Sequence, residues 1–262
     1  MSQPNPYQPP QAPVLDYQAP SMPGRLLGSP RRVAAARGAA WYGDAWRMLI
    51  KNAGLWLVNL AIIAVLVMTA WLPPWAGLPL QYLLTPFALA VLAVACDAVR
   101  RDAPLRGEEI FGPLAERGGQ LSLLGLLYLI GIVVVSVVAI VPLLGWSGMK
   151  MLYGDLQPKD VEDLLLPLLL AMLLLVALSL PLFMAVWMAA ALIVLNGVNA
   201  VAAMSASLIA CSRNFWAFLL YGLAGLALAI AASLPLMLGW LLLLPVIMVT
   251  SYSAYRDIFF ED

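Results

Sequence analysis

The sequence predicts an all-α integral membrane protein: a polytopic bundle of six transmembrane helices, with short amphipathic helices at one membrane surface. Three observations support this fold class. Hydrophobic residues make up 63% of the 262 residues and charged residues only 11%, whereas soluble domains contain about 45–50% and about 25%. Six apolar stretches are each long enough to cross the ~30 Å hydrocarbon core as a helix, which takes about 20 residues. Charged residues gather between these stretches, where helix ends would meet water.

The first 37 residues differ in composition from the rest of the chain. Residues 1–24 are rich in Pro and Gln, and no basic segment leads into an apolar run, so they do not resemble a signal peptide. Such a stretch buries too little apolar surface to offset its chain entropy. We expect a disordered cytoplasmic tail over residues 1–37 and one transmembrane domain over residues 38–262. The PxxP-like spacing of the prolines in residues 1–24 could recruit an SH3-type partner, but a spacer that binds nothing is the favoured interpretation.

The predicted spans follow one another with short separators that contain proline or glycine. In chain order they are residues 55–72, 80–99, 121–144, 164–195, 215–232 and 236–255. The fourth is longer than a bilayer requires, and we expect Pro181 to kink it, because proline leaves the carbonyl four residues earlier without a donor. Pro86 and Pro245 are expected to distort the second and sixth spans in the same way.

The basic residues predict the orientation. Twelve of the 14 Lys and Arg residues lie on the side of both chain ends, and only Lys150 and Lys159 lie on the other side. The positive-inside rule then places both termini in the cytoplasm. Trp71, Trp75 and Trp146 fall at the outer interface in this orientation, where aromatic residues are enriched.

A weaker pattern recurs before the first, third and fifth spans. Each time, apolar residues at helical spacing are followed by a basic residue and a turn-former: Lys51-Asn52, Arg117-Gly118 and Arg213-Asn214. A helix with one apolar stripe lies in the headgroup plane, and a cation at its end reaches lipid phosphate. We interpret this as three copies of one unit, namely interfacial helix, basic turn, outward span and return span; the alternative is three unrelated amphipathic loops. Lys51, Arg117 and Arg213 are thus candidate lipid or partner contacts.

Polar residues near the span ends provide two further candidate sites. Asp97 lies inside a span, with Arg100 and Arg101 at i+3 and i+4 on the same helix face. We favour a structural ion pair, with a proton or ion site as the alternative. The segment from Asn196 to Asn199, together with Arg213 and Asn214, could bind a lipid headgroup or small anion, although a simple turn is the favoured interpretation. We count these three asparagines among the lipid or partner contact candidates.

The residue types argue against most catalytic chemistry. The chain contains no histidine, and Cys96 and Cys211 have no CxxC spacing. We expect no metal, no cofactor, no nucleic-acid partner and no catalytic residue. The favoured function is a non-enzymatic scaffold or assembly factor, or a lipid-interacting protein, whose partners are bilayer lipid, another membrane protein or a second copy. The alternatives are a small transporter or lipid-handling protein that uses the kinked second, fourth and sixth spans, and, third, a membrane enzyme.

Four segments carry a family resemblance. They are RLLGSPRRVAAARGAAWYGDAWRMLIKNAGLWL from Arg25, EIFGPLAERGGQLSLLGLLYLIG from Glu109, SASLIACSRNFWAFLLYGL from Ser205 and the ending SAYRDIF. They resemble a family of uncharacterised proteobacterial inner-membrane proteins, which implies a six-span fold in the bacterial inner membrane and adds no activity or site residue. In architecture alone, the alternation of amphipathic and spanning segments also resembles the membrane domain attached to some glycerophosphodiester phosphodiesterases.

Overall fold

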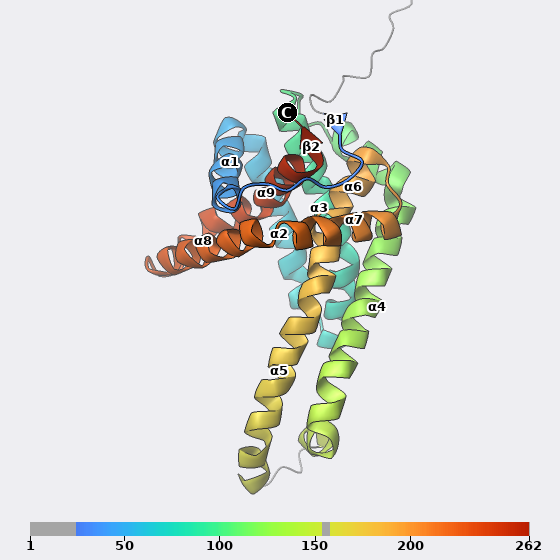
Figure 1. The fold of residues 1–262 in the computed structure, drawn as a ribbon, viewed down its shortest axis with the longest axis vertical. Helices are drawn as coiled ribbons and strands as arrows, with labels where there is room; N and C mark the ends of the chain where they lie inside the picture. Colours follow the sequence, from blue (N-terminus) through green and yellow to red (C-terminus); the bar gives the residue numbers. More distant parts are fainter. Residues whose placement is uncertain (1–24, 154–157, 262) are drawn as a thin grey trace, which may run out of the picture.

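The computed structural model of the chain describes residues 25–153 and 158–261 (Figure 1). Helices make up nearly all of these residues: α1 (Arg37–Lys51), α2 (Ala53–Ala70), α3 (Pro74–Arg100), α4 (Gly107–Tyr153), α5 (Pro158–Trp187), α6 (Ala189–Asn196), α7 (Ala200–Arg213), α8 (Phe215–Ser233) and α9 (Trp240–Phe259). Strands β1 (Arg25–Leu26) and β2 (Phe260–Glu261) pair antiparallel, so the two ends of the described chain lie side by side.

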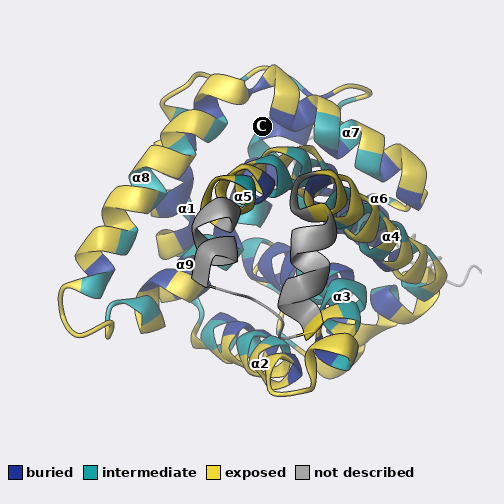
Figure 2. Ribbon diagram, turned by 90° about the horizontal axis from the view of Figure 1, so that it is seen from below, coloured by how far each residue is buried: buried dark blue, intermediate teal, exposed yellow. Residues whose placement is uncertain are grey.

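The predicted membrane fold is confirmed. Among the described residues, six helical runs are long and apolar enough to cross a membrane: Ala53–Ala70, Pro74–Arg100, Gly107–Pro142, Leu165–Asn196, Phe215–Ser233 and Trp240–Phe259. Figure 2 shows many exposed residues along these helices, and large apolar side chains make up much of this exposed surface. Helices that are apolar on all sides suit a surrounding of lipid, in which every backbone polar group is paired within the helix.

The spans do not all run in one direction. Helices α4 and α5 pack against each other along the long axis of the molecule and extend beyond the other helices. Helix α8 runs across this axis in both views (Figures 1 and 2). It contacts chiefly α1 and α9 and buries only Ala217 and Ala232. Its direction therefore depends on α1 rather than on the α4–α5 pair.

The apolar stripe of α1 packs on protein and not on lipid. Trp41, Ala45 and Leu49 are fully buried, and the neighbours of α1 are mainly α8 and α9. Trp46, on the edge of the stripe, remains 43% exposed and meets Trp56 edge to face. The helix before the first span is thus part of the packed domain, which differs from the expected helix lying in the headgroup layer.

The predicted threefold unit is present only twice. Helix α1 ends at Lys51 and α7 ends at Arg213, each before an asparagine, as expected. Helix α4, by contrast, begins at Gly107 and passes through Arg117-Gly118 without interruption. Asparagine side chains hydrogen-bond the backbone groups that a helix break exposes, whereas Gly118 has no side chain to do so. The segment before the third span is therefore helical as predicted, but it is the first part of the span.

The fourth span is interrupted at Met188, seven residues after Pro181. Helix α5 continues through Pro181 and ends before Met188, where the helical hydrogen bonding is interrupted. The hydroxyl of Ser207, from α7, lies in this interruption: it accepts a hydrogen bond from the Met188 amide at 3.1 Å and donates one to the Met184 carbonyl at 2.6 Å. A side chain inserted between a carbonyl and the amide four residues later is a known cause of helix breaks.

The ordered domain also begins earlier than residue 38. The Leu27 amide donates to the Phe259 carbonyl at 2.9 Å, and the Arg31 amide donates to the Ile258 carbonyl at 3.0 Å. Because these backbone groups pair with the C-terminal segment, residues 25–37 belong to the domain, and the predicted boundary of the tail is wrong there. Residues 1–24 of the expected tail, and Asp262, lie outside the described residues.

A close helix crossing gives a first testable prediction. A Cβ atom added to Gly38 would lie 1.8 Å from the carbonyl oxygen of Ala217 in α8, so the missing side chain lets α1 and α8 touch. We expect Gly38→Ala to lower the free energy of unfolding by about 1–3 kcal/mol, because overpacking forces the two backbones apart. The measurement is the melting temperature in mild detergent.

Gly43→Ala is the matched control, because nothing lies within 4 Å of a Cβ at Gly43 in the same helix. Alanine favours a helix over glycine by up to about 1 kcal/mol, so this variant should be neutral or more stable. If both variants melt at the same temperature, the close crossing of α1 and α8 does not contribute to stability.

The Ser207 bridge gives a second prediction. Ser207→Ala removes the partner of a buried amide and a buried carbonyl, and we expect a loss of about 1–3 kcal/mol in unfolding free energy. Ser205→Ala, two residues away in α7, removes an exposed hydroxyl that bonds only its own helix; the change there should stay within about 0.5 kcal/mol. Chemical unfolding in detergent measures both. Equal stability of the two variants would mean that the break at Met188 does not need the hydroxyl.

Candidate functional site

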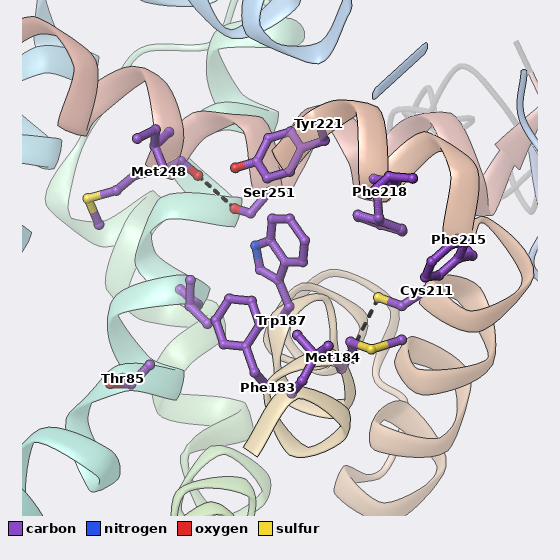
Figure 3. A pocket seen from close by; sticks show the side chains of 14 residues that line it. Thr85, Phe183, Met184, Trp187, Cys211, Phe215, Phe218, Tyr221, Met248 and Ser251 are labelled. Atoms are coloured by element: carbon purple, nitrogen blue, oxygen red, sulfur yellow. Dashed lines mark hydrogen bonds between the residues drawn. The ribbon is translucent and has the colours of Figure 1, made fainter. Parts of the chain in front are cut away.

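An apolar cavity of about 500 Å³ lies between α3, α5, α7, α8 and α9 (Figure 3). Cavities of this size hold small molecules or parts of larger ones. The residues that line it are Thr85, Leu89, Leu180, Phe183, Met184, Trp187, Cys211, Phe215, Phe218, Leu219, Tyr221, Ile247, Met248 and Ser251.

An aromatic cluster forms one side of the cavity, with Trp187 in the middle. The Trp187 ring lies 5.4 Å from Phe183 and 5.3 Å from both Phe218 and Tyr221, measured between ring centroids. Trp41 of α1 continues the cluster, at 5.1 Å from Phe218. Aromatic pairs at these separations attract beyond the effect of area burial. The cluster therefore connects α5 and α8 to each other and to α1.

The hydroxyl groups of Thr85 and Ser251, at the cavity, form hydrogen bonds within the protein. Thr85 donates to the Gln81 carbonyl at 2.7 Å and Ser251 donates to the Met248 carbonyl at 2.7 Å. The Trp187 indole N–H differs, because it has no hydrogen-bond acceptor among the described residues. In Figure 3 the indole stands in the middle of the cavity. The cavity thus combines apolar walls with one N–H donor.

Cys211 lies at one end of the cavity without the character of a nucleophile. Its thiol donates to the Met184 carbonyl at 3.7 Å, and burial raises the pKa of the thiol to about 12. At neutral pH the group stays protonated, and a thiol rather than a thiolate is a poor nucleophile and metal ligand. Both Cys96 and Cys211 are free and buried. Among the described residues, no three His, Cys, Asp or Glu side chains gather in a way that could hold a metal ion.

An ionic cluster around Asp257 lies next to the aromatic cluster. The Asp257 carboxylate accepts hydrogen bonds from Arg31 at 3.1 Å, from Arg37 at 2.6 Å and from the Trp41 indole at 2.9 Å. Arg37 also pairs with Asp44 at 2.9 Å. The hydrogen bond that Arg37 donates to Asp257 raises the pKa of Arg37 above its ordinary value. The sequence offered no signal for this cluster, since its members come from both ends of the chain.

Asp97 forms the ion pairs that its spacing from Arg100 and Arg101 predicted. The carboxylate, in a residue only 3% exposed, pairs with Arg100 at 2.9 Å and Arg101 at 2.8 Å. Tyr252 of α9 adds a third contact that the sequence did not reveal: its hydroxyl donates to Asp97 Oδ1 at 2.8 Å and accepts from Arg100 Nε at 3.0 Å. With its oxygens occupied by two cations and a phenol, Asp97 links α3 to α9.

Two candidate asparagines are used at helix ends. Asn196 accepts a hydrogen bond from the Tyr255 hydroxyl. Asn199 caps α7, where its side-chain oxygen accepts from the Ala202 amide at 2.9 Å. N-caps of this kind satisfy an amide that the helix itself leaves free. These contacts fit the turn interpretation of the segment from Asn196 to Asn199 rather than a site that gathers several amides on one ligand.

Asn214 connects the α7–α8 junction to the N-terminal segment. Its side-chain oxygen accepts from the Val33 amide at 2.8 Å, and its side-chain nitrogen donates to the Arg31 carbonyl at 2.9 Å. The side chain therefore binds the backbone on both sides of Arg32 in the manner of a strand partner. Asn214 is 3% exposed, so it positions the chain instead of offering its amide to solvent or lipid.

The three candidate cations have different surroundings. Lys51 pairs with Asp102 at 2.7 Å. Arg117 is exposed and its guanidinium packs against Gly197, the residue with positive φ that ends α6. Arg213 donates to the carbonyl oxygen of Pro30 at 3.2 Å. The structure does not bring the three together around one ligand; Arg213 is the one whose chain neighbours, at positions 211 and 215, line the cavity.

Comparison of the chain with protein-family models, with curated proteins and with solved structures finds no match. A functional proposal therefore depends on the geometry of this chain. The geometry is that of a membrane protein with six candidate spans and a cavity whose walls, apart from one indole N–H, resemble the interior of a bilayer.

Proposed function

We propose that this protein is a non-enzymatic, lipid-interacting scaffold of the bacterial inner membrane, and that membrane lipid occupies the cavity between α3, α5, α8 and α9. The apolar cavity of about 500 Å³ among helices that themselves face lipid carries the proposal. An apolar chain in such a cavity exchanges one hydrocarbon surrounding for another, so van der Waals packing and a few polar contacts decide whether it stays.

The proposed orientation has both termini in the cytoplasm. The charge distribution of the sequence supports it by the positive-inside rule. Trp71 and Trp75, at the turn between α2 and α3, are 86% and 80% exposed, as suits tryptophans that anchor in the outer headgroup layer. The side chains of Trp146, Lys150 and Lys159 lie outside the described residues.

A second function, a lipid-handling protein or small transporter, is favoured by the break at Met188. Transport proteins often line their substrate sites with discontinuous helices, and the break between α5 and α6 lies next to the cavity through Met184 and Trp187. In this alternative the break would allow α5 to change its direction while lipid passes. Lipid flux in vesicles that contain the purified protein separates it from a static scaffold.

Lipid binding can be tested with a substitution whose larger side chain fills the cavity. We expect Leu219→Trp to reduce co-purified lipid to the background level of the detergent, because Leu219 lines the cavity on α8. Leu223→Trp, one turn further along α8 and 55% exposed, makes the same change outside the lining and should keep the lipid. Mass spectrometry of the lipid extracted from each protein in mild detergent gives the ratio of lipid to protein. Equal lipid content in all three proteins would contradict the proposal.

Labelling tests the orientation. In intact cells, a membrane-impermeant thiol reagent should label Tyr153→Cys, and it should label Glu261→Cys only after the membrane is opened. Both positions are exposed, and both native cysteines are buried, which keeps the background low. Labelling of both variants from the same side would show that the proposed topology is wrong.

A further inference from the structure

We infer that the cavity binds one acyl chain of an anionic phospholipid, whose phosphate contacts Arg213 and Arg32 and whose ester carbonyl accepts from the Trp187 indole. This inference rests on the proposed lipid binding and adds the class of lipid and its orientation. It starts from the charges at one end of the cavity. Arg213 is exposed, and its side chain hydrogen-bonds one group of the described residues, the neutral Pro30 carbonyl. Its charge is therefore not matched by a carboxylate among the described residues.

The backbone on either side of Arg32 is bound by the residue that follows Arg213. Asn214, the neighbour of Arg213, binds the Arg31 carbonyl and the Val33 amide, which are the backbone groups on either side of Arg32. The Arg32 side chain is exposed and forms no ion pair with a described residue. Asn214 thus holds the backbone on both sides of Arg32, and neither Arg32 nor Arg213 forms an ion pair with a described residue. Guanidinium groups donate several N–H groups in a plane and bind phosphate in two-point contacts.

Other cations of the domain are already paired with carboxylates. Arg31 and Arg37 bind Asp257, and Arg47 binds Asp44. On the far side, Lys51 binds Asp102, and Arg100 and Arg101 bind Asp97. Arg32 and Arg213 differ from these cations because neither pairs with a carboxylate of the described residues, and the residues two positions from Arg213 line the cavity.

One end of the cavity is lined by residues close to Arg213 in the sequence. Cys211 and Phe215, which lie two residues before and after Arg213, both line it. Figure 3 shows these two side chains at one end of the cavity, the Trp187 indole in the middle, and Thr85 with Met248 towards the other end. The end with Cys211 and Phe215 is the one that adjoins Arg213 in the sequence, the indole N–H lies in the middle, and the walls are otherwise largely apolar. A phospholipid has its phosphate, its ester carbonyl and its acyl chain in the same order.

This order excludes the simpler ligands. A free phosphate would use the cations and leave the cavity unused, whereas a zwitterionic lipid would bring its own positive charge close to Arg32 and Arg213. A cation near an anionic membrane group contributes enough to change affinity about fivefold. The two arginines together should therefore favour an anionic phospholipid over a zwitterionic one with the same chains by about 30-fold.

The experiment uses the full-length protein in detergent and measures its affinity for phosphatidylglycerol and for phosphatidylcholine with identical chains, by native mass spectrometry. Arg213→Ala and Arg32→Ala should each lower the affinity for phosphatidylglycerol about fivefold and leave that for phosphatidylcholine unchanged. Arg213→Lys keeps the charge and should keep most of the preference. Arg117→Ala, which removes an exposed arginine away from the cavity lining, is the matched control and should change neither affinity.

Trp187→Phe tests the middle of the site, because it keeps an aromatic ring and removes the N–H. It should weaken binding of ester-linked phosphatidylglycerol and should not affect an ether-linked analogue, which has no carbonyl. If wild-type protein binds both headgroups equally and Leu219→Trp abolishes both, lipid occupies the cavity but the inferred lipid class is wrong. If inorganic phosphate stabilises the protein through Arg213 and Leu219→Trp has no effect on lipid, the ligand is a free anion and the inference is overturned.

Discussion

The carboxylate of Asp257 accepts hydrogen bonds from Arg31, Arg37 and the Trp41 indole, and the position of α8 depends on this contact. Helix α8 buries few of its own residues and lies across the long axis of the molecule. Its most extensive contact is with α1, through the Gly38 crossing and through the rings that meet Trp41, and α9 and Trp187 of α5 add further contacts. Asp257 fixes Trp41, Trp41 packs on Phe218, and α8 in turn closes one side of the cavity. An ionic contact at the end of the chain therefore shapes an apolar site some distance away along the sequence.

Polar side chains satisfy the backbone wherever the helices break. Ser207 bridges the interruption at Met188, Asn199 caps α7, and the Gln120 side chain accepts from the Ala200 amide at 2.8 Å. In a hydrocarbon surrounding each unpaired amide or carbonyl costs several kcal/mol, at roughly the scale of transfer to an apolar solvent. A break is consequently tolerated where a side chain, from another helix or from the cap position, pairs with the freed backbone group.

The sequence predicted what depends on local pattern. The spans follow from runs of apolar residues, and the Asp97 contacts follow from i+3 and i+4 spacing in one helix. It failed where a distant residue decides the outcome. Pro181 is a local signal for a kink, but the break lies at Met188 because Ser207 comes from another helix. The tail boundary was wrong because residues 25–37 find their partners at the C-terminus. The cavity combines five helices, and no single stretch of sequence carries its signature.

Met184 belongs both to the break at Met188 and to the cavity lining, so a change at one affects the other. The Met184 carbonyl accepts from Ser207 and from the Cys211 thiol, while the Met184 side chain lines the cavity together with Trp187. Straightening α5 across Met188 would return this carbonyl to the amide of its own helix and move both side chains. A ligand that fits the cavity only in the broken form therefore stabilises that form by the difference in its affinity for the two. For such a ligand the coupling would be reciprocal, so the Ser207 bridge would strengthen its binding by the same factor.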